Sequence, residues 1–319
     1  MSVVVHRVVL RSDQQFGGKL PLHHLGLLLA ELSLAIRGCV SMAFRNRSHV
    51  RGRRPGWLDR AADVRFVDHQ DHGEPVLYFE APPLGEAAPD VYAQQSLFPE
   101  ADDRPAAEDT AFDLLGDLLA DVQQQNTDSI HFDRSLLRRI THFKQVFKRG
   151  PYTEVDFTSR RFSSEAPARF TPALVESAKV LLGKTPAPQR VRIVGQLDGL
   201  VASTQRFSVW LDSGEKVTGV FAEDQMDAMQ ALWRTRVLVL GKAIYRASGR
   251  LLNIDAEAVQ PGDNEPRIFS RMPTPPGRKI DISKLRKPQG PKSGISAIFG
   301  KWPGDETDEE LEAALKELG

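Results

Sequence analysis

Histidine is the side chain that proteins use most often for acid–base catalysis and metal ligation, so the eight histidines of this chain are the first candidates for chemistry. His23 and His24 are adjacent in the sequence and not at helical ligand spacing, and His69 and His72 stand in a polar turn without supporting cysteine or carboxylate geometry. A metal site needs several converging ligands. No predicted strand-to-helix junction carries a phosphate-binding glycine loop, a zinc-protease motif or a nucleophile elbow. We therefore predict a protein that is not an enzyme and that uses no metal and no cofactor.

Clustered basic residues could bind phosphate. Seven arginines lie between Arg37 and Arg60, against one acid, Asp59. A second basic segment, 133–148, is predicted to be helical and carries several cations. Phosphate contacts of this kind make affinity depend on salt. Both segments could equally be solvated surface, or could pair with the acidic stretch 86–128, because the chain as a whole has 42 basic and 42 acidic residues.

Aromatic residues beside basic ones could stack on single-stranded nucleic acid. Five short strands, with a helix (222–233) after the third, are predicted at 190–197, 206–211, 216–221, 237–245 and 251–259. This order is typical of an OB-fold or a related small barrel. Alternation places Phe207 and Trp210 on opposite faces, and most of the aromatic residues are needed to fill such a barrel. The candidate nucleic-acid contacts are Arg51, Arg53, Arg54, Arg206 and Lys216.

The N-terminal half must position the first basic cluster. The pattern predicts a strand at 3–10, a long buried helix at 22–44 and strands at 63–67 and 75–80. Residues 82–104 are rich in proline and acids and are predicted to form a loop or linker. Helices are expected at 107–123 and 133–147, the second ending at Gly150-Pro151.

The compartment follows from cysteine usage and hydropathy. The single cysteine, Cys39, excludes an internal disulfide and is expected to be buried in a helix. The apolar run 25–36 contains Glu31 and is too short to span a bilayer. No signal peptide is evident, so we predict a cytoplasmic protein without a membrane partner.

The chain is long enough for two domains. We predict an α+β protein with an N-terminal α/β module and two following helices (1–150), and an OB-like β-barrel module (151–261). The second module is expected to begin with a strand at 153–157 and a helix at 172–182. A flexible, basic, proline-rich linker (262–293) and a partner-binding tail (294–319) follow.

The tail combines an apolar knot with an acidic amphipathic helix. Thr307 and Glu310 form a predicted capping box, and acidic residues surround the helix start, where the helix dipole favours them. The apolar stripe of this helix consists of Leu311, Ala314, Leu315 and Leu318. A helix this short is marginal alone in water, so the tail is expected to dock on something.

The string from Ile298 to Glu310, IFGKWPGDETDEE, resembles the C-terminal tails of antitoxins that pair with PIN-domain ribonuclease toxins in the virulence-associated type II toxin–antitoxin class. The likeness covers about 25 residues only. It implies an antitoxin-like protein whose partner is a PIN-domain toxin, an enzyme that cuts RNA by metal-assisted hydrolysis. Most such antitoxins begin with a small DNA-binding domain, which is not found here.

In that interpretation, Phe299 and Trp302 anchor the tail in an apolar groove, because large aromatic residues dominate interface energetics. Lys301 would occupy the acidic metal site of the toxin, with Lys292 as a second candidate. Ile298 and the apolar stripe complete the contact surface. In one alternative Trp302 folds back on the barrel as a latch. In another, the protein is a nucleic-acid-binding accessory factor that uses the barrel and the basic clusters. A salt titration with single-stranded oligonucleotides separates the antitoxin function from the nucleic-acid-binding function.

Overall fold

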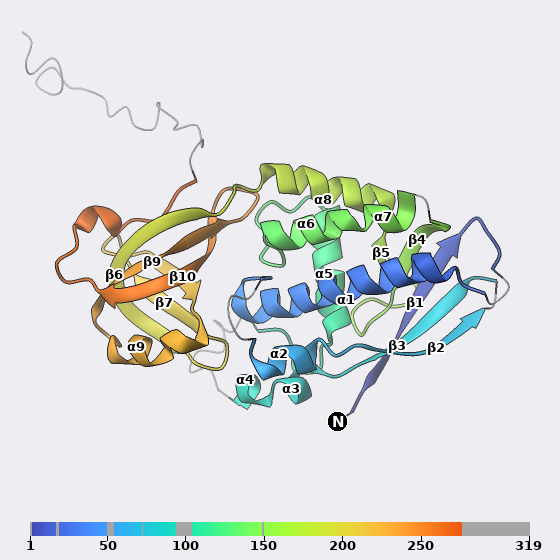
Figure 1. Cartoon of the computed structure of the whole chain (residues 1–319), viewed down its shortest axis with the longest axis horizontal. Helices are drawn as coiled ribbons and strands as arrows, with labels where there is room; N and C mark the ends of the chain where they lie inside the picture. Colours follow the sequence, from blue (N-terminus) through green and yellow to red (C-terminus); the bar gives the residue numbers. More distant parts are fainter. Residues whose placement is uncertain are drawn as a thin grey trace, which may run out of the picture. The chain divides into compact units, whose positions relative to one another are not determined.

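The computed structural model describes residues 2–16, 19–49, 54–71, 73–93, 104–148 and 150–275 (Figure 1). These residues form two five-stranded sheets together with helices, so the predicted α+β class is confirmed. The predicted tail and most of the predicted linker lie outside the described residues.

The first sheet is antiparallel and has β1 (Val4–Ser12) at its centre. Its order is β2-β3-β1-β4-β5, with β2 at Arg65–Asp71, β3 at Pro75–Ala81, β4 at Tyr152–Phe157 and β5 at Ala168–Phe170. His6, Val8 and Leu10 alternate along β1 and are buried, whereas Arg7 on the opposite face is exposed. One face of the sheet therefore carries the hydrophobic core.

The predicted module boundary at 150 is wrong for the residues that follow it. β4 pairs with β1, with Val8 opposite Phe157, and β5 continues the same sheet. Val155 and Phe157 enter the first hydrophobic core. Strand alternation predicts that 153–157 is a strand, but it does not say which of two sheets supplies the partner, because the pairing spans more than 140 residues of sequence.

The helices that cover the core are α1 (Leu22–Arg45), α5 (Ala111–Gln123), α6 (Arg134–His142), α7 (Lys144–Lys148) and α8 (Pro172–Lys184). Thr110, Asp133 and Thr171 cap α5, α6 and α8 through their side-chain oxygens. Cys39 is buried in α1, and burial raises the pKa of its thiol. α1 is long and apolar enough to cross a membrane by length and composition, contrary to expectation, yet 56% of its most apolar window is buried inside the structure.

Short helices replace part of the loop predicted at 82–104. α3 (Leu84–Ala87) packs against α2 (Gly56–Ala61), and α4 (Pro89–Ala93) packs against α3; Leu84, Ala87 and Val91 are buried. Prolines precede α2 and α3 and begin α4, where a fixed φ suits a helix start. Residues 94–103 of that stretch lie outside the described residues.

The second sheet contains β6 (Gln189–Val201), β7 (Arg206–Trp210), β8 (Lys216–Val220), β9 (Arg236–Tyr245) and β10 (Leu251–Pro261). Its order is β10-β8-β7-β6-β9. The last strand of this order, β9, pairs with the first, β10, so the sheet closes on itself. All pairs are antiparallel except β10 with β8. The five predicted strands are confirmed, and the predicted helix is a 3-10 turn followed by α9 (Met226–Ala231).

Direct contacts join the closed sheet to the first module, and residues up to Pro276 form one compact unit. Arg47 donates to Asp133 of the first module and to Asp255 of β10, at 3.2 Å in both cases. Asn253 donates to the carbonyl of Arg45 at 2.9 Å, and the Trp57 indole donates to the carbonyl of Ser203 at 2.8 Å.

The first residues of the predicted flexible linker pack on the second sheet. Gly262 donates its backbone N–H to the carbonyl of Arg236 at 2.9 Å, and the Ser270 hydroxyl accepts from the backbone N–H of Asp212 at 2.7 Å. Ser270 is buried, and the Arg192 guanidinium lies over the ring of Phe269. A linker starting at 262 is therefore wrong up to residue 275, because composition does not reveal these backbone contacts.

Candidate functional site

One aromatic residue stands on the outer surface of the closed sheet. Trp210 at the end of β7 is 42% exposed, whereas Phe207 is 3% and Phe221 1% exposed because both fill the interior. The cross-strand register places Trp210 between Gln196 of β6 and Lys216 of β8. These three residues, Gln196, Trp210 and Lys216, are the outer row of the sheet.

The outer row brings a cation onto an aromatic ring. The Lys216 ammonium lies 5.6 Å from the centroid of the Trp210 ring, a cation–π distance. The same ammonium is 3.4 Å from Asp198, and 45% of the Lys216 side chain is exposed. An exposed indole can stack on a nucleobase and a neighbouring ammonium can contact a phosphate, so the row offers the two elements of single-strand recognition.

Two loops of the closed sheet are engaged within the protein. In the β6–β7 loop, the carbonyl of Ser203 accepts from Trp57. In the β9–β10 loop, Ser248 donates to Asp128 and the Arg246 guanidinium donates to the Asp128 carbonyl at 2.7 Å. Among the described residues, internal contacts hold both loops, whereas Trp210 and Lys216 of the outer row remain partly exposed.

Of the other predicted nucleic-acid contacts, the two that the structure describes, Arg54 and Arg206, are not part of the outer row. Arg206 is half-buried, Arg54 is exposed at the N-terminal side of α2, and Arg51 and Arg53 lie outside the described residues. Within the predicted arginine cluster, Arg45 and Arg47 are buried, and Arg47 forms ion pairs. The ion pairs of Arg47 support internal pairing over phosphate binding, and burial keeps Arg45 away from a phosphate on the surface.

The second basic segment also makes internal contacts. Arg134 donates to the carbonyl of Leu182 at 2.8 Å, and Arg139 is 3.3 Å from Glu31. Its arginines therefore tie α6 to α8 and α1. The acidic stretch finds its main cations elsewhere, at Arg160 and Arg161.

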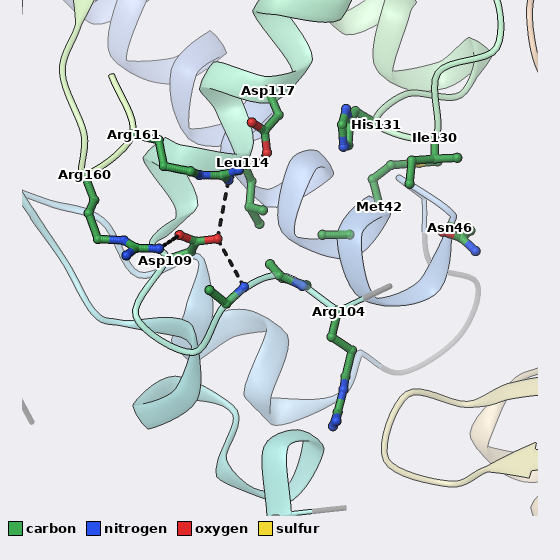
Figure 2. A pocket seen from close by; sticks show the side chains of 13 residues that line it. Met42, Asn46, Arg104, Asp109, Leu114, Asp117, Ile130, His131, Arg160 and Arg161 are labelled. Atoms are coloured by element: carbon green, nitrogen blue, oxygen red, sulfur yellow. Dashed lines mark hydrogen bonds and ion pairs between the residues drawn. The ribbon is translucent and has the colours of Figure 1, made fainter. Parts of the chain in front are cut away.

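Those two arginines line a charged cavity of about 360 Å³ that sequence reasoning missed (Figure 2). Its apolar wall includes Met42 of α1, Leu114 of α5 and Ile130. Its polar residues are Asn46, Arg104, Asp109, Asp117, His131, Arg160 and Arg161.

Ion pairs satisfy most of this charge. Figure 2 shows Arg160 and Arg161 reaching the buried carboxylate of Asp109, at 2.7 Å and 3.4 Å. Arg161 is also 2.7 Å from Asp117. Asp113, one turn before Asp117, accepts from the backbone N–H of Arg161 at 3.0 Å. These contacts hold the loop after β4 against α5.

A histidine–aspartate pair stands at the other side of the cavity. His131 Nδ1 lies 2.8 Å from Asp121 Oδ2. Burial opposes ionisation of Asp121, but hydrogen bonds from His131, Ser129 and Asn126 outweigh it and lower the pKa to about 2. Burial raises the pKa of Asp117, and Arg161 and His131 only partly oppose this. Neighbouring carboxyls on one helix therefore differ in acidity.

A sequence signal for this cavity exists. Asp109, Asp113, Asp117 and Asp121 recur every four residues, which places them along one side of α5 and its N-terminal extension. Arg160 and Arg161 are the counterions of Asp109, Asp113 and Asp117, whereas Asp121 pairs with His131. Composition alone indicates an acidic stretch, whereas the four-residue spacing of these aspartates places them in one row on the helix.

The predicted partner-binding residues of the tail lie outside the described residues. Among the described residues no three histidine, cysteine, aspartate or glutamate side chains are grouped as a metal ion would require. No protein-family model, no curated protein and no solved structure matches this chain.

Proposed function

We propose that the closed sheet is an OB-like barrel that binds single-stranded nucleic acid on its outer row. The strand order supports the OB-like assignment: the first, second and third strands pair in sequence, the fifth pairs in parallel with the third, and the helix follows the third. Fold alone does not define function, so the proposal depends on the row itself.

The observation that carries the proposal is Trp210. A tryptophan that is 42% exposed on the outer face, where β7 ends beside the start of β8, with an ammonium 5.6 Å from its ring, has no role in filling the interior. Base–aromatic stacking is worth about 1–3 kcal/mol per base and tolerates any sequence. With a net charge of zero, the protein is expected to bind modestly and with a shallow salt dependence.

Fluorescence anisotropy of the full chain with labelled single-stranded oligonucleotides, at increasing salt, tests the proposal. Binding that prefers single strands over the matching duplex, and that weakens with salt, supports it. Equal affinity for duplex and single strand would instead indicate a non-specific phosphate interaction.

We also propose an antitoxin-like role for the tail, in which a cytoplasmic, non-enzymatic protein neutralises a PIN-domain ribonuclease. The resemblance of residues 298–310 supports this second candidate. Trp302→Ala is expected to weaken the complex by about 2–4 kcal/mol, as for a central aromatic anchor.

A binding titration of the full chain against a PIN-domain ribonuclease from the same genome, with the melting temperature of the same variant, tests the antitoxin role. A lower melting temperature with unchanged affinity would favour a tail packed on its own chain. Lys301→Glu is expected to restore ribonuclease activity more than it loosens the complex.

A further inference from the structure

A second cavity, of about 880 Å³, lies between α2 and the β6–β7 loop. Its lining combines apolar side chains, among them Pro55, Trp57 and Met226, with four charged ones: Arg54, Asp59, Asp90 and Glu223. We propose that this cavity binds an aliphatic polyamine.

The described lining of the cavity carries more negative than positive charge. The three carboxylates come from three elements, Asp59 from α2, Asp90 from α4 and Glu223 from the turn before α9. All three are exposed, and none forms an ion pair or a side-chain hydrogen bond within the described part of the chain. Among the described residues of the lining, one cation, Arg54, stands against these three carboxylates.

A buried amide gives an independent indication of a ligand. Gln205 lines the cavity, is 5% exposed, and its Oε1 has no hydrogen-bond partner among the described residues. A buried polar atom without a partner costs about 1–3 kcal/mol, so native proteins seldom leave one unpaired. A ligand that donates hydrogen bonds would satisfy this oxygen, and the amide can present either end because its terminal torsion is broad.

The arrangement favours a chain of ammonium groups over a metal ion. The carboxylates border one cavity, but no three of the described acidic, histidine or cysteine side chains are grouped as a metal would need. A polyamine distributes its charge along methylene groups. Its ammonium groups donate to separated carboxylates, while the methylene groups can pack on Pro55 and Met226.

Isothermal titration of the full chain with spermidine, without nucleic acid and at fixed ionic strength, tests the proposal independently of the barrel function. Glu223→Gln is expected to weaken spermidine binding about fivefold, the equivalent of about 1 kcal/mol for one partly exposed ion pair. Asp224→Asn is the matched control, because Asp224 is the adjacent exposed acid and does not line the cavity. Asp90→Asn, on a different helix, repeats the test if Glu223→Gln does not fold.

Gln205→Met tests whether the side-chain amide of Gln205 contributes to spermidine binding. It is expected to weaken spermidine binding while the melting temperature of the free protein does not fall, because the Oε1 atom gives up no hydrogen bond. Equal spermidine affinity in the wild type, Glu223→Gln and Asp90→Asn, or displacement of spermidine by Mg²⁺ at the same charge concentration, would overturn the proposal.

Discussion

Asp133 holds Arg47, the residue that connects the first module to β10, and its replacement should cost a large part of the stability. Its carboxylate accepts from the Arg47 guanidinium at 3.2 Å, from Ser48 at 3.0 Å (backbone) and 2.6 Å (hydroxyl), and from the backbone N–H of Leu136 at 2.9 Å. The Asp133 side chain is fully buried and the Arg47 side chain is 10% exposed. Arg47 also reaches Asp255 of β10.

Asp133→Ala removes a helix cap, worth about 1 kcal/mol, and leaves the buried Arg47 charge with one partner. Breaking a buried ion pair by deleting one side typically costs about 3–5 kcal/mol. The two effects share atoms and do not add, so we expect a loss of about 3–5 kcal/mol in the free energy of unfolding. Asp133→Asn keeps a capping oxygen and loses only the charge, and should fall between Asp133→Ala and the wild type.

Urea denaturation followed by circular dichroism measures these losses. The matched control is Asp63→Ala, because Asp63 pairs with Arg65 at 2.7 Å on the surface, with side chains 48% and 73% exposed. Such an exposed pair should contribute little to stability because water and salt screen it. If Asp133→Ala costs no more than Asp63→Ala, the buried network does not stabilise the junction and the reasoning fails.

Two further predictions concern the charged cavity and the helices around it. A Cβ at Gly116 would lie 2.1 Å from the Phe162 ring, so Gly116→Val should destabilise the protein by about 1–3 kcal/mol. A Cβ at Gly183 would meet nothing within 4 Å, so Gly183→Ala should stabilise the protein by up to about 1 kcal/mol. The melting temperatures of the two variants test this contrast. Folding lowers the pKa of Asp121 to about 2. Its ionised form therefore stabilises the fold at a pH above the ordinary aspartate pKa of about 4, and this stabilisation is lost as the pH falls from about 4 towards 2. The difference in unfolding free energy between the wild type and Asp121→Asn should shrink over that range, and a constant difference would contradict the assigned hydrogen bonds.

The strands of the closed sheet could be predicted because their signal is local. Each strand, from 5 to 13 residues long, alternates or is continuously apolar, and Gly214 and Gly249 mark turns with positive φ. The outward direction of Trp210 followed from the same alternation, since Phe207 and Val209 occupy the other face.

What the sequence could not reveal depends on long-range contacts. In the sequence Arg47 belongs to a basic cluster, but its ion-pair partners, Asp133 and Asp255, are 86 and 208 residues away. Long-range contacts also account for three other features. These are the pairing of β4 with β1, the docking of Ser270, and the convergence of Asp59, Asp90 and Glu223 on one cavity. Local patterns identify elements, whereas these contacts depend on how distant elements meet.

The most direct test of the proposed function compares two exposed aromatic residues on different sheets. Trp210→Ala should weaken single-strand binding by about 1–3 kcal/mol, or roughly five- to 150-fold. Phe66→Ala is the matched control, because Phe66 is 50% exposed on β2 of the first sheet and should not change the affinity. Unchanged binding by Trp210→Ala, or an equal loss in both variants, would contradict the assignment of the outer row as a nucleic-acid-binding face.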